Sequence, residues 1–372
     1  MKNKKLIILF LITLAVILTA GITAKMRAPQ SSVETIPLFP DLTNRINDVA
    51  KIVIEGDEKT VELSQQGEIW VITTTDNYPA LFNKVRAAVI NLTSFKIVNE
   101  KTDNPELYNR LGVEDPAVED ATSLLITLFD EKDQKIVSLI VGNPRQSSGS
   151  KPGLYVRKPD EKTALLVEGV LDISANQTDW FHRDLFDIPS DRVSSVKINF
   201  ADGNAFEIYK EAPEQTDFEV HGENIANESA SKIIINRLGN SMQEMRADGV
   251  IAAGNFSFPD DAVTTTVTTF DGLVINAKLA QVDDKSYVNF TFTTDPEKLS
   301  ADKETAANET GTNAEAAISE VNITELAQTL DHALSGWVYL IPDFKYEALT
   351  TSPDSLINML KALPEGQSIP NK

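Results

Sequence analysis

The longest stretch of the chain without a charged side chain is residues 6–24, and most of its residues are hydrophobic. As a helix rising about 1.5 Å per residue, this run reaches about 28 Å, close to the hydrocarbon thickness of a bilayer. Three lysines precede it, against Lys25 and Arg27 after it, and the positive-inside rule then places the start of the chain in the cytoplasm. The pattern predicts a cytoplasmic tip and transmembrane signal anchor in residues 1–28.

A cleaved signal peptide is the alternative interpretation of the same run. Residues 22–24 offer only a poor small-x-small cleavage site, and the run is longer than the usual hydrophobic region of about 7–15 residues. The pattern favours a retained anchor. We therefore expect a single-pass protein of the inner (cytoplasmic) membrane, with the bulk of the chain in the periplasm.

After a proline-containing linker at residues 29–47, apolar and polar residues alternate with the period of two that is typical of strands. The alternation predicts a three-stranded meander with strands at residues 50–54, 60–63 and 69–72. The spacing then changes to three and four, which predicts a helix whose apolar stripe packs on the meander. The stripe consists of Leu81, Val85, Ala88, Val89 and Leu92.

A short helix is predicted next from its capping residues. Asp103 or Asn104 is placed to cap it, Pro105 occupies the first helical position and Gly112 follows its end. Apolar runs then predict a second meander, with strands at residues 123–129, 136–142, 154–157 and 164–167. A helix at residues 169–176 is expected to close this half of the chain.

The order of these features begins again at residue 192, with strands, an Asp202-Gly203 turn, a helix, and two strands joined by an Asp271-Gly272 hairpin turn. Four residue pairs match at separations of 144, 148, 141 and 157: Ile52 with Val196, Trp70 with Phe218, Phe129 with Phe270, and Trp180 with Trp337. We attribute the long last separation to residues 295–322, which contain no aromatic residue and have the composition of a disordered insert.

The expected fold class is α+β, with two tandem copies of a β-meander and helix unit and mostly antiparallel sheets, preceded by one N-terminal transmembrane helix. The first copy is assigned to residues 48–190. The second, which lacks the short helix, is assigned to residues 191–350, and a C-terminal helix and tail to residues 351–372. Chance similarity between two generic β-rich halves is the alternative to a duplication.

The features of the first copy resemble a known family in their order. They are the anchor, the Trp70 strand, the helix, the sequence at 107–116, a strand pair ending at Val141-Gly142, the Tyr155-Val156-Arg157 strand, and Arg183-Asp184-Leu185. In this order they are similar to the family called domain of unknown function 4340. The second copy lacks a Tyr-x-x-Leu-Gly-x-x-x-Pro stretch.

That resemblance implies a membrane-anchored periplasmic protein of Gram-negative bacteria. It also implies a relationship to auxiliary subunits of ABC exporters of the gliding-motility type. It assigns no catalytic residue that could be carried over to this chain.

Charge and cysteine content narrow the class of protein further. The formal net charge is −21, and because the first 28 residues hold five basic and no acidic side chains, the remainder carries −26 (29 basic against 55 acidic). A surface with this excess of negative charge repels the phosphate backbone of DNA or RNA, which argues against a nucleic-acid partner. The chain has no cysteine, so disulfides and thiolate metal sites are excluded.

Candidate chemistry is sparse. The three histidines, His182, His221 and His332, lie far apart without an i,i+3 or i,i+4 partner, so no metal site is predicted from them. Two serine–lysine spacings occur, at residues 229–232 and 148–151, but Ser229 is better explained as a helix cap. Trp70, Trp180 and Trp337 are expected to pack in cores or between domains, with stacking on a sugar as the alternative.

We therefore expect no catalytic, cofactor-binding or metal-binding residues and no cofactor. The leading hypothesis is a non-enzymatic accessory or scaffold protein that offers edge strands and loops to a membrane-protein or envelope partner, in an ABC-type transport system. The alternative is a binding module for an envelope glycan or a small ligand in the cleft between the two copies. A hydrolase is the third hypothesis.

Overall fold

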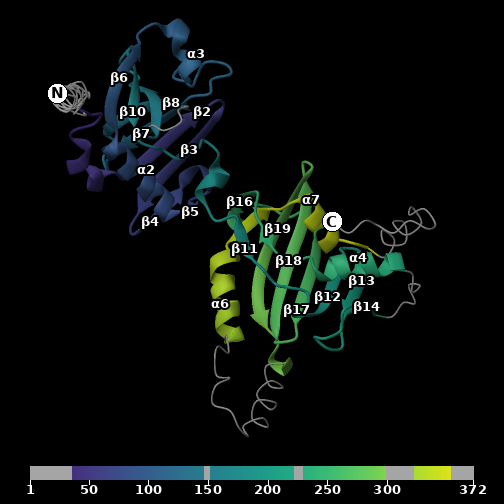
Figure 1. The fold of residues 1–372 in the computed structure, drawn as a ribbon. Coiled ribbons are helices and arrows are strands. Elements are labelled where there is room, and N and C mark those ends of the chain that lie inside the picture. Colours follow the sequence, from purple (N-terminus) through teal and green to yellow (C-terminus); the bar gives the residue numbers. More distant parts are fainter. Residues whose placement is uncertain (1–35, 146–150, 222–228, 299–321, 353–372) are drawn as a thin grey trace, which may run out of the picture.

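The computed structural model describes residues 36–145, 151–221, 229–298 and 322–352. Two antiparallel sheets dominate the fold and form two bodies (Figure 1). The bodies meet near β5 (Tyr78–Pro79), β11 (Asp184–Phe186) and β16 (Gly249–Ala252). The first sheet contains ten strands in the order β1-β6-β10-β9-β8-β7-β2-β3-β4-β5. Its strands are β1 Ile36–Pro37, β2 Lys51–Gly56, β3 Lys59–Gln66, β4 Ile69–Ile72, β5 Tyr78–Pro79, β6 Lys96–Thr102, β7 Leu124–Phe129, β8 Lys135–Pro144, β9 Gly153–Arg157 and β10 Ala164–Glu168.

The predicted first meander and helix are confirmed. Strand alternation points Ile52 and Ile54 of β2 to one face together with Val61 and Leu63 of β3. Helix α2 (Phe82–Ser94) covers this face with the expected stripe, in which Val85, Ala88, Val89 and Leu92 are buried. Full burial of a valine or leucine side chain such as Val85 or Leu92 contributes about 1.5–3 kcal/mol.

The opposite face of the first sheet is partly covered by the segment that precedes β7. Its capping residues act as predicted: the Asn104 side chain accepts a hydrogen bond from the Glu106 amide, and Gly112 ends the helix at φ 64°. The helix consists of a 3₁₀ turn, η4 (Pro105–Leu107), followed by the single α-turn α3 (Tyr108–Leu111). Tyr108 and Val113 pack there against Ile140 of β8.

The helix predicted at residues 169–176 is wrong. These residues run without regular structure from β10 to the 3₁₀ helix η5 (Gln177–Trp180). The reason is a period of two: Leu171, Ile173 and Ala175 pack on the core, whereas Val170 and Asp172, which alternate with the first two, are exposed. The segment behaves as an extended chain that covers the end of the sheet.

The second sheet contains eight strands in the order β14-β13-β12-β17-β18-β19-β20-β16, and β11 (Asp184–Phe186) pairs separately with β15 (Met245–Arg246). Helix α4 packs on β12, α6 on β18 and β19, and α7 on β19. The strands are β12 Val193–Asn199, β13 Ala205–Tyr209, β14 Glu219–Val220, β16 Gly249–Ala252, β17 Val263–Thr269, β18 Leu273–Val282, β19 Lys285–Thr294 and β20 Trp337–Leu340. The helices are α4 Ser229–Gly239, α6 Ile323–Leu334 and α7 Asp343–Leu349, and the remaining 3₁₀ turns are η1 Leu42–Asn44, η2 Ile46–Asp48, η3 Thr73–Thr75 and η6 Ala253–Asn255.

The expected mixture of helices and mostly antiparallel sheets is confirmed, since every strand pair of the described residues is antiparallel. The predicted anchor at residues 6–24 lies outside the described residues. So do most of the predicted insert and the C-terminal tail from residue 353. Among the helices that the structure does describe, none combines the length and the apolar character needed to cross a bilayer.

Candidate functional site

The junction between the two sheets is built around the turn that follows η3. Asp76 and Asn77 both adopt positive φ values, 51° and 66°, a conformation that Asp and Asn tolerate better than most residues. The turn carries the Asp76 carboxylate to the outer edge of β16. There Oδ2 accepts a hydrogen bond of 2.8 Å from the Ala252 amide, and Oδ1 accepts one of 3.0 Å from the Asn255 side chain.

This contact satisfies an edge-strand amide that lacks a partner strand. Because unpaired amides on an edge strand invite pairing with other chains, Asp76 protects that position of β16 from such pairing. The same contact fastens the first sheet to the second.

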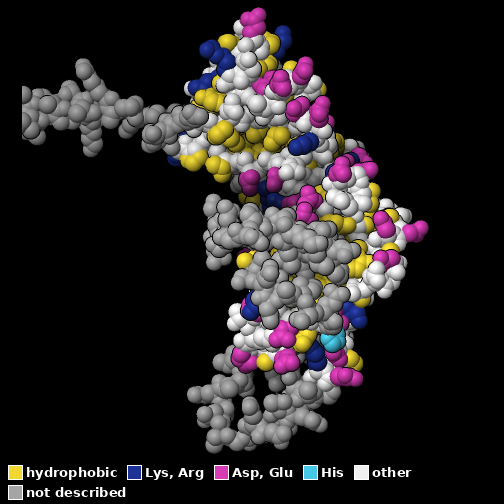
Figure 2. All heavy atoms as spheres, turned by 90° about the vertical axis from the view of Figure 1, so that its right-hand side faces the viewer, with side chains coloured by type: hydrophobic (Ala, Val, Ile, Leu, Met, Phe, Trp, Pro, Cys, Tyr) yellow, Lys and Arg dark blue, Asp and Glu magenta, His cyan; other side chains and the backbone are white. Residues whose placement is uncertain are grey.

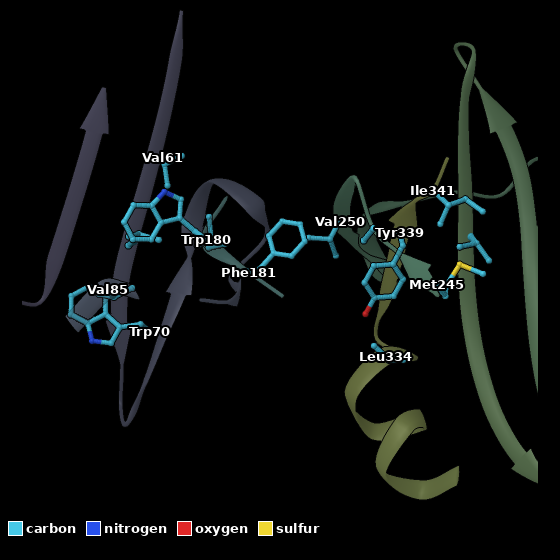
Figure 3. Close-up of a cluster of buried hydrophobic side chains, with 14 of the residues drawn as sticks. Val61, Trp70, Val85, Trp180, Phe181, Met245, Val250, Leu334, Tyr339 and Ile341 are labelled. Atoms are coloured by element: carbon cyan, nitrogen blue, oxygen red, sulfur yellow. The ribbon is translucent and has the colours of Figure 1, made fainter. Parts of the chain in front are cut away.

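Aromatic rings fill the space beside this contact. The ring of Tyr78, in β5, lies edge-on to three others: Trp337 at 4.8 Å between centroids, Phe181 at 5.2 Å and Tyr339 at 6.4 Å. Trp337 and Tyr339 belong to β20 of the second sheet, whereas Phe181 follows η5. Figure 3 shows Phe181 directed from the first body toward Val250 of the second. Edge-on geometry between aromatic rings is favourable.

Burial at the junction perturbs two hydroxyl groups. Tyr339 is fully buried, and its hydroxyl has no hydrogen-bond partner among the described residues. Burial raises the pKa of Tyr339 far above its usual value, and the neighbouring Tyr78 contributes in the same direction. Burial likewise raises the pKa of Tyr78. Both hydroxyls are therefore held in their neutral form.

The segment that joins the two bodies is held by ion pairs. Arg183 donates a 3.1 Å hydrogen bond to the Ala247 carbonyl and pairs with Asp248. Asp184, the next residue, forms an ion pair with Arg246 at 2.9 Å. These two residues also lie opposite each other where β11 pairs with β15. The Arg183-Asp184-Leu185 sequence thus stabilises the connection between the two bodies.

The other sequence signals of the resemblance also have structural roles. Arg157 is buried, with its guanidinium 4.6 Å from the Tyr108 ring, and its Nε donates a 3.0 Å hydrogen bond to the Val113 carbonyl. Its Nη1 donates to the carbonyls of Pro159 and Glu161 at 3.4 and 3.3 Å. Arg157 therefore fixes the 105–116 segment on the sheet.

The predicted candidate side chains do not come together. His182, His221 and His332 are exposed in separate parts of the structure. In the described part of the chain, no three His, Asp or Glu side chains cluster in a way that could hold a metal ion. Ser148 lies outside the described residues, as does the side chain of Ser229. Ser229, expected to cap the helix from the position before it, is instead the first residue of α4. Lys232 and Lys151, their expected lysine partners, pair instead with Asp217 at 3.0 Å and Glu168 at 2.7 Å.

The three tryptophans pack as expected. Trp180 is fully buried, with its indole N–H donating a 2.8 Å hydrogen bond to the Ser174 carbonyl. Trp70 is buried against α2, as Figure 3 shows from its position beside Val85. Trp337 contributes to the junction through Tyr78. Trp70 and Trp180 are thus largely buried, whereas Trp337 is half-buried.

A pocket of about 590 Å³ lies between the 38–45 segment, the start of β8 and the β9–β10 turn. Its cations are already neutralised. Lys135 pairs with Asp160 at 3.7 Å, and Lys158 pairs with Glu161 at 3.0 Å. Arg45, which also lines the pocket, pairs with Asp48 at 3.3 Å, so each cation of this lining already has a carboxylate partner.

Sequence reasoning missed the Asp76 contact and the junction as a whole. A signal was present, because Asp76-Asn77 after a strand is a typical sequence for a turn with positive φ. The partner of that turn, 176 residues away, leaves no local trace in the sequence.

Comparison with known proteins identifies one family. A family model described as Domain of unknown function (DUF4340) matches residues 70–291, more than half of the chain. The match begins at Trp70 in the first sheet, crosses the junction and ends within β19 of the second sheet. No curated protein matches the chain.

Proposed function

The chain belongs to the family domain of unknown function 4340, whose description states no activity, and we propose that it is a non-enzymatic accessory or scaffold protein. In this proposal residues 6–24 anchor it in the inner membrane as a single pass. The two sheets then stand in the periplasm, where they contact a polytopic partner of an ABC-type transport system.

The observation that carries the proposal is the packed junction. Asp76 and Tyr78 of the first body are engaged by β16 and β20 of the second, so the space where a ligand cleft would lie is filled by side chains. A body in which two sheets hold one orientation suits a protein that bridges or braces partners. It suits a ligand-binding module in the cleft less well, because such modules need room between their lobes.

We further propose that the two bodies arose by tandem duplication. The order β6-β10-β9-β8-β7-β2-β3-β4 corresponds position by position to β16-β20-β19-β18-β17-β12-β13-β14. In chain order, α2 and α4 each come after the third strand of these lists, β4 and β14, and before the fourth, β6 and β16. In this correspondence β20, which contains Trp337, is equivalent to β10. The sequence match of Trp337 to Trp180, which follows β10 in η5, is therefore displaced by one element.

The surface is consistent with a partner that is not a nucleic acid. Acidic side chains are distributed over the face drawn in Figure 2, and hydrophobic side chains gather on its upper part, which belongs to the first body. Several large apolar side chains of the first body are exposed, among them Phe82 at 53% and Ile69 at 54%. Exposed apolar groups of this kind are candidates for protein contact.

Co-purification tests the proposal. The tagged full-length protein is extracted from its own membranes in mild detergent, and the proteins that accompany it are identified by mass spectrometry. Recovery of a polytopic permease and an ATPase in fixed ratio is expected. Recovery of nothing above background would overturn a stable-complex role.

A matched pair of variants makes the test specific to the junction. Asp76→Ala removes the contact with β16, whereas Asp57→Ala changes an exposed residue of the β2–β3 turn. If the orientation of the two bodies matters for the partner, recovery falls for Asp76→Ala and not for Asp57→Ala.

A further inference from the structure

We propose that a cavity at the end of the first sheet binds a single-chain anionic amphiphile, with Arg145 contacting the head group and the cavity walls enclosing the hydrocarbon chain. The cavity holds about 370 Å³ and lies where β7, β8 and β9 meet the segment that follows β10. This volume lies within the range of about 300–1,000 Å³ that is usual for small-molecule sites. The binding site is distinct from the sheet junction.

The walls of the cavity are mostly apolar. One side comes from strand residues and the other from the extended chain at residues 169–173, which sequence reasoning had assigned to a helix. A helix at that position would present a different set of side chains. The apolar lining consists mainly of Leu124, Val141, Leu154, Val170, Leu171 and Ile173.

Among the described residues that line this cavity, Arg145 is the only charged one. Its Nη2 donates to the Lys151 carbonyl, but its Nε is buried without a hydrogen-bond partner among the described residues. None of the ion pairs formed between described residues includes Arg145. A buried guanidinium N–H without a hydrogen-bond acceptor is energetically unfavourable. An acceptor with a negative charge, supplied by a ligand in the cavity, would remove this cost.

The larger pocket beside Lys135 and Lys158 differs from this cavity because its lysines are already paired. There each lysine already has a carboxylate partner within 4 Å. Arg145 differs from these two lysines because it faces a mostly apolar cavity and has no carboxylate partner among the described residues. That contrast identifies the Arg145 cavity, and not the larger pocket, as the place where an external anion is needed.

The chemistry of the lining defines the ligand class. A guanidinium binds carboxylate or phosphate oxygens with paired, charge-assisted hydrogen bonds. The apolar walls exclude a bare, fully hydrated anion but accept methylene groups, which gain free energy on leaving water. Fatty acids and lipid phosphate monoesters both provide this combination, and neutral or cationic amphiphiles do not.

Photolabelling of the full-length protein in nanodiscs of zwitterionic lipid tests the site. The probes are dodecanoate, dodecyl phosphate and dodecanol, each with a diazirine at the end of the chain, and labelled peptides are mapped by mass spectrometry. We expect one or both anionic probes to label the peptides that contain Leu124 or Leu171, and the stronger of the two identifies the head group. Dodecanol labelling these peptides as strongly as the anions would overturn the proposal.

Two arginine variants locate the charge that is responsible. Labelling by the anionic probe should fall about tenfold in Arg145→Gln, the change expected for loss of a charge-assisted hydrogen bond. It should be unchanged in Arg110→Gln, which alters an exposed arginine of α3 outside the cavity. Equal labelling of wild type and Arg145→Gln contradicts the assignment.

A second pair of variants keeps the test valid if Arg145→Gln fails to fold. Val170 lines the cavity but is 57% exposed, so both Val170→Asp and Val170→Asn should be tolerated by the fold. The aspartate brings a negative charge to the rim and should weaken anionic labelling relative to the asparagine. Equal labelling of these two variants would count against an anionic ligand, whatever the outcome of the co-purification experiment.

Discussion

The Asp76 carboxylate accepts a 2.8 Å hydrogen bond from the Ala252 amide, joining a turn of the first sheet to the edge strand β16 of the second. A carboxylate in this position resembles an additional strand in one respect, since it satisfies an edge amide. It differs in that it offers no further donors or acceptors to extend the sheet. The junction is thus closed to additional strands at this point.

Loss of this contact should weaken the junction. Asp76→Ala leaves the Ala252 amide and the Asn255 side chain without their acceptor, which should lower the free energy of unfolding by about 1–3 kcal/mol. Urea denaturation measures this change, and hydrogen exchange at the Ala252 amide should accelerate. The control Asp57→Ala should leave both unchanged, and unaltered exchange at Ala252 in Asp76→Ala would show that the amide has another acceptor.

Alkaline pH should destabilise the protein through Tyr339. Burial raises its pKa in the folded state above the value of 10 that the unfolded chain has, so the unfolded state loses this proton first as pH rises. The stabilising contribution is complete below pH 10 and is lost as pH increases beyond it. Tyr339→Phe has no such proton, so its stability should fall less steeply above pH 10.

Buried lysines act in the opposite direction and must be separated from this effect. Burial lowers the pKa values of Lys210, Lys298 and Lys345, so the unfolded state binds more protons than the folded state as pH approaches 10.5. The contribution of these lysines makes the protein more stable as pH rises, and it is the same in wild type and in Tyr339→Phe. The difference between their urea midpoints, followed from pH 8 to 11, isolates Tyr339, and parallel curves would contradict the assignment. At pH 7 the variant should be as stable as wild type or more so, because the hydroxyl that it removes has no partner.

Local sequence signals predicted the elements well where the pattern is strong. The meander of β2 to β4, the stripe of α2 and the caps around Asn104 and Gly112 all follow from period and capping chemistry. β19 could have been found as well, because Val288, Phe290 and Phe292 alternate with more exposed residues. β6 could not, since its polar sequence carries no clear period and its strand state depends on pairing with β10.

The candidate sites could not be predicted from local sequence patterns, because they depend on contacts between residues that are distant in the sequence. Residues that match in spacing, such as Ser229 and Lys232, are common in helices, and Lys232 is taken up by Asp217 from another element. The cavity of Arg145 depends on how residues 169–173 cover the sheet end, and that path is set by tertiary packing of Leu171 and Ile173. No local pattern distinguishes a buried arginine without a carboxylate partner from a surface arginine.

Gly142 should not tolerate a side chain. A Cβ at this position of β8 would lie well inside van der Waals contact with the carbonyl oxygens of Leu111 and Gly112. Because the obstacle is backbone, the 105–116 segment would have to move, and Gly142→Ala should destabilise the protein by about 1–3 kcal/mol. The matched control is Gly254→Ala, where nothing lies near an added Cβ. Equal melting temperatures of the two variants would show that the segment shifts without cost.

Arg157 should be irreplaceable by lysine. Its guanidinium donates hydrogen bonds to three separate carbonyls, those of Val113, Pro159 and Glu161, while it lies against the Tyr108 ring. A lysine ammonium is a compact charge on a flexible stem, so it cannot reach all three acceptors from the same position. Since hydrogen bonds to charged groups contribute about 1.5–3 kcal/mol each, Arg157→Lys should lose at least one such contribution in urea denaturation.

The same variant should act locally first. Arg157 is the residue that fastens the 105–116 segment to β9, so amide exchange in that segment should accelerate in Arg157→Lys before the rest of the first sheet is affected. The exposed Arg110, changed to lysine within the same segment, is the matched control and should leave exchange unchanged. If Arg157→Lys instead accelerates exchange uniformly over both sheets, the arginine supports the whole fold and not the segment, and the family signals at 107–116 and 155–157 would need a different explanation.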